Sequence, residues 1–295
     1  MNEPTVLALI DLMADKLDDA GLSFADGYGQ GTTNAFDEAC WLVLWKLGFA
    51  IDDLDSHQNQ LVTLGDVASI AILFEERIRT RKPAAYLTHE AWLLGLPFYV
   101  DERVIIPRSL IAEALFDESI DPWLGEHTHR VLDVCTGNGS LAVLAAMVYP
   151  DVVVDAADIS PDALAVARIN VDRHDLASRI TLIASDALAA CSGPYDLILC
   201  NPPYVNAASM ATLPAEFRAE PSIALAGGSD GMDFIRRLFE TVDRYMSENA
   251  VLVLEIGHEK RHFNQAFPEL DPLWLDTSAG SEQVMLLTRE QLALR

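Results

Sequence analysis

Residues 131–146, VLDVCTGNGSLAVLAA, join two apolar runs through a loop that contains two glycines. The spacing predicts a strand over Val131–Val134 and a helix over Leu141–Val148. Gly137 and Gly139 allow a tight turn, and they let a ligand approach the backbone at the start of the helix. A strand, a glycine loop and a helix in this order are typical of the first βαβ unit of a nucleotide-binding domain.

Strand-like and helix-like segments continue to alternate after this unit. Pro161–His174 predicts a helix, and short apolar runs predict further strands at Val152–Ala157, Ile180–Ala184, Tyr195–Cys200, Ala250–Ile256 and Gln283–Thr288. Repeated βαβ units indicate an α/β fold with a parallel, doubly wound sheet. Ligands bind such sheets at the carboxyl ends of the strands, so the residues that follow these strands are the candidate site.

The N-terminal part of the chain has a different pattern. Apolar residues recur at helical spacing over residues 6–17, 39–47 and 67–78, and Asn34 is a plausible helix N-cap. Between Tyr86 and Pro107 the pattern alternates around turn residues, as in a β-hairpin. We therefore expect three parts, namely a helical domain at 1–84, a hairpin linker at 85–108 and an α/β domain at 109–295.

The composition is that of a globular protein, with 51% hydrophobic and 22% charged residues. No run of about 18 apolar residues occurs, so no membrane span is expected. The acidic N-terminus does not have the basic start of a signal peptide. None of the cysteines forms a C-x-x-C pair, which favours reduced thiols and a cytoplasmic location: they are Cys40, Cys135, Cys191 and Cys200.

The formal net charge is −25, of which residues 1–108 carry −9 and residues 109–295 carry −16. Both parts would repel a phosphate backbone, which argues against duplex DNA or RNA as the partner. A basic protein would be attracted, although acidity by itself also keeps a protein in solution. One cluster of basic residues, just before Pro83, stands out from this acidic composition. It either complements a helix dipole or contacts a substrate, and it consists of Arg77, Arg79, Arg81 and Lys82.

The glycine loop predicts a nucleoside cofactor but does not identify it. Gly137-x-Gly139-x-x-Ala142 also fits the dinucleotide fingerprint. Asp158 ends the second predicted strand at the spacing expected for an acidic residue that contacts a ribose hydroxyl.

Two further carboxylates favour a methionine-containing nucleoside. Asp133 lies within the first strand and could accept from the ammonium group of a methionine moiety, or it could stabilise the turn. Asp186 follows the third strand, where an adenine edge would lie, or it could cap a helix.

Residues 196–205, DLILCNPPYV, end an apolar strand with a polar side chain. Asn201 and Pro202 each precede a proline, so both are held extended. The Asn201 side-chain oxygen and the Pro202 carbonyl are then two fixed acceptors, which can hold a planar NH₂ group and aim its lone pair at an electrophilic methyl. Tyr204 would form an aromatic wall over that group. An ordinary Pro-Pro loop is the simpler alternative.

The segments Asp133–Gly139, Asp158 and Asn201–Tyr204 together resemble S-adenosylmethionine-dependent methyltransferases that modify amide or exocyclic amino nitrogens. Residues 81–109 and 219–238 resemble the protein glutamine methyltransferases. This resemblance implies a Rossmann-like class I methyltransferase domain, with a mostly parallel seven-stranded sheet and an antiparallel C-terminal strand. It also implies a small helical domain that recognises the substrate and a β-hairpin linker.

Two branches of this family differ after Pro107-Arg108. The release-factor branch usually continues with proline, whereas this chain has Ser109 and resembles the branch that methylates a glutamine of large-subunit ribosomal protein L-three. That branch often has a proline where Leu110 stands. The resemblance implies L-three as the protein substrate, and the acidic surface favours the free protein before ribosome assembly. A release-factor glutamine methyltransferase is the alternative.

The resemblance also implies which residues form the site. Asn201 and Pro202 would bind the glutamine amide, and Pro203 and Tyr204 would also contact the substrate. The implied S-adenosylmethionine-binding residues are Asp133, Cys135, Thr136, Gly137, Asn138, Gly139, Asp158, Ile159, Asp186, Ala187 and Asn201. No metal is expected.

Three other functions fit the sequence less well. Methylation of adenine in DNA uses the same Asn-Pro-Pro-Tyr chemistry, but it would need a positive groove that this acidic chain does not offer. Residues 258–262, HEKRH, match a zinc-protease pattern, yet they follow directly on the strand VLVLEIG, and Pro268 ends any helix soon afterwards. A cofactor-binding chaperone that performs no catalysis would not need Asn201-Pro202-Pro203-Tyr204.

Overall fold

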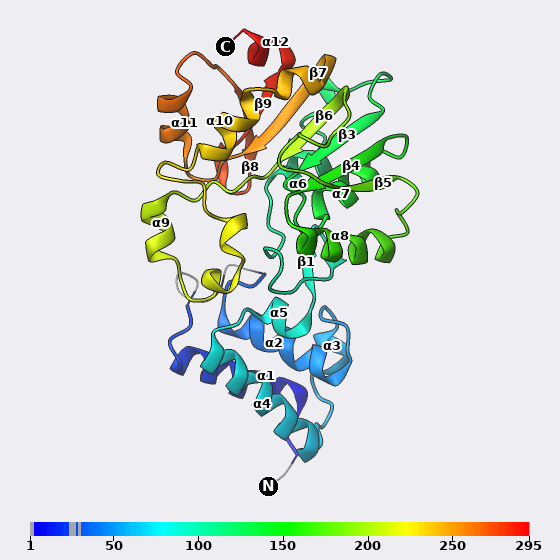
Figure 1. The fold of residues 1–295 in the computed structure, drawn as a ribbon. Coiled ribbons are helices and arrows are strands. Elements are labelled where there is room, and N and C mark those ends of the chain that lie inside the picture. The colour runs from blue at the N-terminus through cyan, green and yellow to red at the C-terminus, as the bar shows by residue number, and fades with distance from the viewer. Residues whose placement is uncertain (1–2, 24–27, 29–30, 295) are drawn as a thin grey trace. The chain divides into compact units, whose positions relative to one another are not determined.

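The computed structural model describes residues 3–23, 28 and 31–294 (Figure 1). Its internal contacts divide the chain into two compact units. Unit 1 comprises Met1–Ala91 and Leu213–Ala219, and unit 2 comprises Trp92–Thr212 and Glu220–Arg295. Residues 213–219 therefore belong to unit 1, although the chain on both sides of them belongs to unit 2. The expected boundaries at residues 84 and 108 remain predictions.

Unit 1 is helical in its described residues. The three predicted helical segments are confirmed, and the helices are α1 (Val6–Asp19), α2 (Ala35–Leu47), α3 (Leu54–His57), α4 (Leu64–Thr80) and α5 (Ala84–Thr88), with the 3₁₀ turn η2 (Phe217–Ala219). Thr5, Asn34 and Thr63 cap α1, α2 and α4, because each side chain accepts a hydrogen bond from the backbone N–H three residues later. The apolar faces that bury Leu9, Leu42 and Phe74 form the core of this unit.

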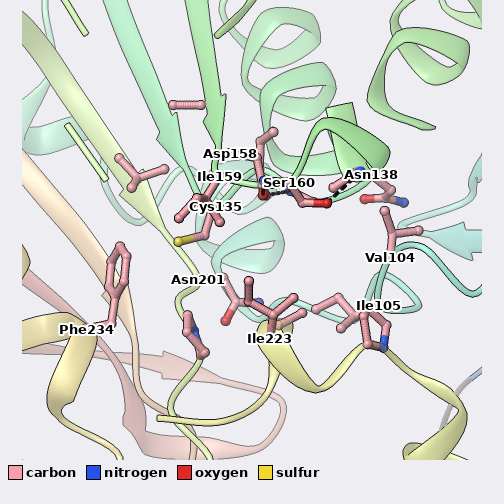
Figure 2. A pocket seen from close by; sticks show the side chains of 18 of the residues that line it. Val104, Ile105, Cys135, Asn138, Asp158, Ile159, Ser160, Asn201, Ile223 and Phe234 are labelled. Carbon is pink, nitrogen blue, oxygen red and sulfur yellow. Dashed lines mark hydrogen bonds between the residues drawn. The ribbon is translucent and has the colours of Figure 1, made fainter. Parts of the chain in front are cut away.

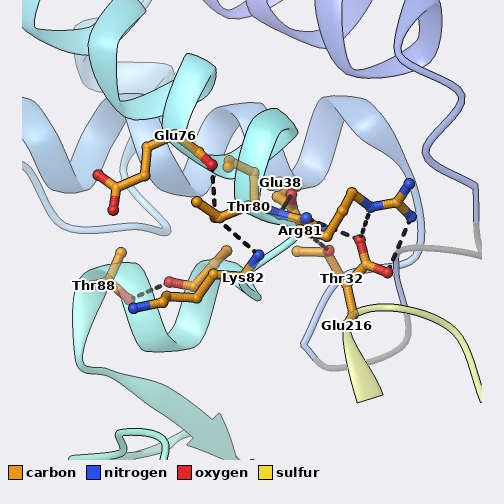
Figure 3. A network of polar contacts seen from close by, with 10 residues as sticks. Thr32, Glu38, Glu76, Thr80, Arg81, Lys82, Thr88 and Glu216 are labelled. Atoms are coloured by element: carbon orange, nitrogen blue, oxygen red, sulfur yellow. Dashed lines mark hydrogen bonds and ion pairs between the residues drawn. The ribbon is translucent and has the colours of Figure 1, made fainter. Parts of the chain in front are cut away.

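A buried ionic cluster holds the 213–219 segment within unit 1 (Figure 3). Arg77 on α4 is fully buried; its Nε lies 2.7 Å from Glu38 Oε1, and its Nη1 lies 3.0 Å from Glu216 Oε1. Arg81 also bonds Glu216 through Nε and Nη2. Two of the four basic residues left open by the sequence thus pair with carboxylates inside this unit.

A short hairpin begins at Ala91, the last residue of the first part of unit 1, and consists of β1 (Ala91–Leu93) and β2 (Leu96–Phe98). It is shorter than the alternating pattern over 86–107 indicated. Tyr86 belongs to α5, and after β2 the backbone groups of Tyr99 bond the Asn170 side chain instead of a partner strand. The Asp101 carboxylate then accepts from the backbone N–H and guanidinium of Arg103, which forms a local turn.

Unit 2 is built on a seven-stranded sheet of order β5-β4-β3-β6-β7-β9-β8. The strands are β3 (Arg130–Val134), β4 (Val153–Asp158), β5 (Ile180–Ala184), β6 (Tyr195–Cys200), β7 (Met246–Glu255), β8 (Leu273–Thr277) and β9 (Gly280–Thr288). The first five in sequence order pair in parallel, and β9 is antiparallel to both of its neighbours. The predicted α/β fold, with its mostly parallel sheet and antiparallel C-terminal strand, is confirmed. The short edge strand β8 was not located from the sequence.

Alternate strand residues enter two separate cores, one on each face of the sheet. Val131, Leu197 and Val251 pack with α6 (Ile111–Phe116) and α7 (Ser140–Val148). Leu132, Ile198 and Leu252 pack on the opposite side, where the helices are α10 (Asp233–Phe239), α11 (Lys260–Ala266) and α12 (Arg289–Ala293). Each such buried side chain contributes about 1.5–3 kcal/mol of transfer free energy.

The remaining elements of unit 2 connect these layers. They are η1 (Asp121–Trp123), α8 (Pro161–Arg173), α9 (Ala207–Thr212), η3 (Ser222–Ala224) and η4 (Val242–Tyr245). Within the described ranges, none of the helices combines the length and apolar character needed to cross a lipid bilayer.

Candidate functional site

A cavity of about 340 Å³ in unit 2 lies at the carboxyl ends of the parallel strands (Figure 2). Figure 2 shows Asp158 and Ile159 from the end of β4, Asn201 after β6, and Val104 and Ile105 among the side chains that surround it. The wall also includes the glycine loop, the Ser185–Ala187 turn, Pro203, Phe234 and Arg237. A cavity of this size, mostly apolar with a few polar groups, is typical of a small-molecule site.

The glycine loop between β3 and α7 needs its second glycine. Gly139 has a left-handed φ of +81°, and a Cβ at this position would lie 3.2 Å from the Ala167 Cβ on α8. A larger residue there would separate the loop from α8. The Asn170 side chain on α8 also donates to the Asn138 carbonyl at 2.8 Å. These contacts hold the loop at the cavity, where Cys135, Thr136, Gly137 and Asn138 all form part of the wall.

Asp158 connects the end of β4 to the glycine loop. One carboxylate oxygen accepts from the Gly137 backbone N–H at 2.9 Å, and the other accepts from the Ser160 N–H at 2.9 Å. Burial raises the pKa of Asp158, and the two N–H donors oppose that rise. Asp158 thus positions the loop and also lines the cavity.

Asp133 is fully buried beneath the loop and is not part of the cavity wall. Its Oδ2 accepts from the Thr136 hydroxyl at 2.5 Å and from the Ala142 N–H at 3.1 Å, as a turn-stabilising carboxylate would. Its Oδ1 has no hydrogen-bond partner among the described residues. Burial raises the pKa of Asp133 to about 7.

The raised pKa of Asp133 predicts a pH-dependent stability. The folded state binds the Asp133 proton more tightly than the unfolded chain, whose carboxyl has a pKa near 3.8. The stabilising contribution is therefore complete below that value and is lost as the pH rises to about 7. Relative to the wild type, Asp133→Asn should gain about 1.4 kcal/mol of unfolding free energy per pH unit across this window. Denaturant titrations of both proteins at several pH values would test this, and a difference that does not vary with pH would contradict it.

Asp186 and Arg237 form an ion pair on the cavity wall, and both side chains are more than half exposed. Asp186 follows β5, as predicted, whereas Arg237 lies on α10. Ala187 takes a left-handed φ of +48° and also lines the cavity. The structure therefore brings the Asp186-Ala187 turn to the same cavity as the glycine loop and Asp158.

The Asn201–Tyr204 segment follows β6, which pairs in parallel with β3, so that Cys200 lies beside Val134. Asn201 and Pro203 line the cavity, while Pro202 is buried. Tyr204 is not part of the wall, and its hydroxyl donates to Glu255 at 3.1 Å. After Tyr204, Val205 forms an isolated bridge with Ala226, and the Val205 N–H donates to the Leu225 carbonyl at 2.8 Å.

Several wall residues could not be predicted from the sequence. Val104 and Ile105 precede the sheet, and Ile223, Phe234 and Arg237 come more than twenty residues after β6. None of them carries a local motif, and only the fold gathers them. Ser140 and Ser160 directly follow predicted loop and strand ends, so their position in the sequence could have indicated them.

The cavity fits the nucleoside cofactor that the sequence predicts. The Asp133 Oδ1 and the Asn138 Nδ2 are buried and have no partner within the part of the chain that the structure describes. Both belong to the loop or to the strand before it, where polar groups of a ligand would bind. Apolar side chains such as Ile159 and Phe234 offer surfaces for a planar base.

The zinc-protease pattern at 258–262 does not place both of its histidines on one helix. His258 precedes α11, which begins at Lys260, and the His262 Nδ1 bonds Glu259. No group of three His, Cys, Asp or Glu side chains suited to a metal ion occurs in residues 3–23, 28 and 31–294.

Comparisons with known proteins agree with the α/β fold. A family model described as the methyltransferase small domain matches residues 111–226. Among solved structures, the hMettl16 catalytic domain in complex with a MAT2A 3'UTR hairpin has a TM-score of 0.51 at 11% identity, covering 78% of this chain and 84% of that one. This similarity supports the fold alone.

Two curated relatives cover almost the whole chain. A ribosomal protein uL3 glutamine methyltransferase of Bordetella pertussis is 51% identical over 267 residues, which is 90% of this chain and 89% of that protein. One of Burkholderia pseudomallei is 45% identical over 298 residues, covering 98% and 95%. With identity at this level over both units, the chain belongs to the ribosomal protein uL3 glutamine methyltransferase family.

Proposed function

We propose that this protein transfers a methyl group from S-adenosylmethionine to the side-chain amide nitrogen of one glutamine in ribosomal protein uL3, the L-three protein of the large subunit. The observation that carries this proposal is the position of Asn201. It follows β6, lines the cavity, and comes from the strand beside the one that leads into the glycine loop. A methyl donor in the cavity and an amide held by Asn201 would then be close together.

The cofactor would supply an electrophilic methyl group on a sulfonium. The cavity is lined by residues 135–138 of the glycine loop, Asp158, Ile159 and the Asp186-Ala187 turn, which would hold the cofactor. Gly139 belongs to the same loop but is not part of the wall. The Asp133 Oδ1 would accept from the ammonium group of the cofactor. Because Asp133 is fully buried beneath the loop, this contact would require a shift of the glycine loop. A cation beside a carboxylate favours the charged form of both groups, which would offset the rise that burial causes in the pKa of Asp133.

The amide nitrogen is a poor nucleophile, because its lone pair is delocalised into the carbonyl. The Asn201 side-chain oxygen and the Pro202 carbonyl would each accept one amide hydrogen. Two acceptors in fixed positions favour pyramidalisation of the nitrogen and direct its lone pair at the methyl group. This arrangement needs no strong base before attack, since the extra proton can leave afterwards.

The charge of the protein supports a basic, unassembled substrate. The net charge of −25 would attract a free ribosomal protein and repel ribosomal RNA. We therefore place the reaction in the cytoplasm before uL3 joins the ribosome. In this proposal unit 1 contributes to recognition of uL3, and DNA is not a substrate.

The test is a methyl-transfer assay with labelled S-adenosylmethionine and three acceptors side by side. Unmethylated uL3 should take the label at a single glutamine, which mass spectrometry would map. Release factor and double-stranded DNA serve as matched acceptors for the two alternative functions. Label on the release factor instead of uL3 would show that the substrate is wrong but the chemistry right, and label on DNA alone would refute both the charge argument and the amide mechanism.

A further inference from the structure

A buried carboxylate at the end of β7 joins two walls of the cavity. Glu255 is 3% exposed, and its Oε1 accepts from the Tyr204 hydroxyl at 3.1 Å. Its Oε2 accepts from the Ser109 hydroxyl at 2.6 Å and from the Leu110 backbone N–H at 2.9 Å. Ser109 lines one part of the cavity, and Tyr204 directly follows Pro203, which lines another. One side chain therefore fixes both segments.

The Tyr204 ring is packed against backbone and cannot move without loss of contacts. A Cβ added at Gly257, which has a φ of +53°, would lie 2.5 Å from the Tyr204 Cε2. The ring thus lies directly on the chain just after β7. Burial, together with the nearby Glu255 charge, raises the pKa of Tyr204, so its hydroxyl stays protonated and can donate.

The backbone beyond Tyr204 is fixed as well. The Val205 N–H donates to Leu225, and the Val205 carbonyl accepts from the Gly227 N–H at 2.9 Å. Asn201 at the other end continues from β6. Between these two attachments, the Tyr204 side chain adds a hydrogen-bonded anchor to the Asn201–Pro203 segment. Gly227 and Gly231 also pack closely against the backbone of Pro203 and Tyr204.

We propose that Glu255 and Tyr204 are positioning residues, which hold the Asn201–Pro203 acceptors in register with the Pro107–Ser109 wall of the cavity. Tyr204 acts through its hydroxyl as an anchor rather than as a wall over the substrate. The catalytic consequence rests on the proposed methyl transfer, whereas the structural link does not. Acceptors that are fixed before the substrate binds need no reorganisation during the reaction, and a misplacement of about 1 Å can lower a rate by about a hundredfold.

Tyr204→Phe tests this role because it keeps the ring and removes only the hydroxyl. We expect kcat to fall by about tenfold or more, with KM for uL3 and the dissociation constant of S-adenosylhomocysteine within about twofold of wild type. The matched control is Tyr195→Phe. Tyr195 is fully buried, whereas Tyr204 is half-buried. Tyr195 likewise donates to a carboxylate, Asp155, at 2.7 Å, but it begins β6, at the end away from the cavity. The kcat of the Tyr195→Phe enzyme should equal that of the wild type.

A Tyr204→Phe enzyme with kcat within twofold of wild type would overturn the proposal. So would an equal loss of kcat in both phenylalanine variants, because that would assign the effect to general destabilisation. A further readout compares kcat in two variants at position 255. Glu255→Gln keeps the shape of the side chain and one acceptor oxygen, whereas Glu255→Ala removes both. Glu255→Gln should recover part of the kcat that Glu255→Ala loses.

Hydrogen–deuterium exchange tests the structural link without any substrate. Glu255→Ala should speed amide exchange at Leu110 and at Tyr204 and Val205 together, and Tyr195→Phe should leave both segments unchanged. If both segments respond but uL3 is not methylated, the link is correct and the proposed function is wrong. If either segment exchanges at the wild-type rate in Glu255→Ala, the link itself is refuted. Should Glu255→Ala not fold, Glu255→Gln gives the same comparison at smaller amplitude.

Discussion

Replacing Asn201 with alanine should lower kcat by about a hundredfold to a thousandfold, the range seen when one preorganised polar group is removed from an active site. Asn201 lines the cavity and would supply one of the two acceptors that hold the glutamine amide. Without it the amide nitrogen keeps its planar geometry and its delocalised lone pair. Binding of S-adenosylhomocysteine should persist, because the glycine loop and Asp158 are unchanged. Steady-state kinetics with uL3 and calorimetry with S-adenosylhomocysteine would measure both effects.

The matched control for this variant is Asn206→Ala. Asn206 lies five residues further along, donates to Glu259 at 2.6 Å and is not part of the cavity wall. Its kcat should stay near the wild-type value. If Asn201→Ala kept more than a tenth of wild-type kcat, the acceptor mechanism would be wrong. If it lost S-adenosylhomocysteine binding as well, Asn201 would belong to the cofactor site instead.

Arg77→Met should destabilise unit 1 by about 3–5 kcal/mol, the usual effect of removing one partner from a buried ion pair. The Arg77 side chain is fully buried, and its two partners, Glu38 and Glu216, are at most 4% exposed. Methionine fills a similar volume, but it leaves Glu38 without its cation and Glu216 with Arg81 alone. Hydrogen exchange of the α1, α2 and α4 amides would measure the loss, since these helices form unit 1.

The control for this second prediction is Arg79→Met on the same helix. Arg79 is exposed, so its replacement should change stability by less than about 0.5 kcal/mol. Adding Glu38→Gln to Arg77→Met should recover part of the loss by removing one uncompensated charge. If Arg77→Met lowered the free energy of unfolding by less than about 1 kcal/mol, the ionic cluster would contribute much less to unit 1 than a typical buried ion pair does.

Local patterns predicted the elements that carry the site. Apolar runs predict β3, β4, β5, β6, β7 and β9, and helical spacing predicts α7 and α8. Asn34 was recognised as a cap, because capping depends on residues within one turn. The hairpin was overestimated where the side chains of Asp101 and Asn170 satisfy the backbone instead of a partner strand. The edge strand β8 was not indicated by the sequence; it is as long as β3 and β5, but Leu275 is its one buried residue.

The sequence alone was sufficient for the α/β fold, the glycine loop and the Asn201–Tyr204 motif, because each depends on backbone preferences within about ten residues. Only the tertiary structure decided that Arg77 pairs with Glu216, 139 residues away, and that Glu255 joins Ser109 to Tyr204. It also decided which residues of the 103–109 and 221–237 segments complete the cavity. The physical reason is that such contacts have no local periodicity. They form only when the packing of the whole sheet and its helices brings distant carboxylates and donors together and removes them from water.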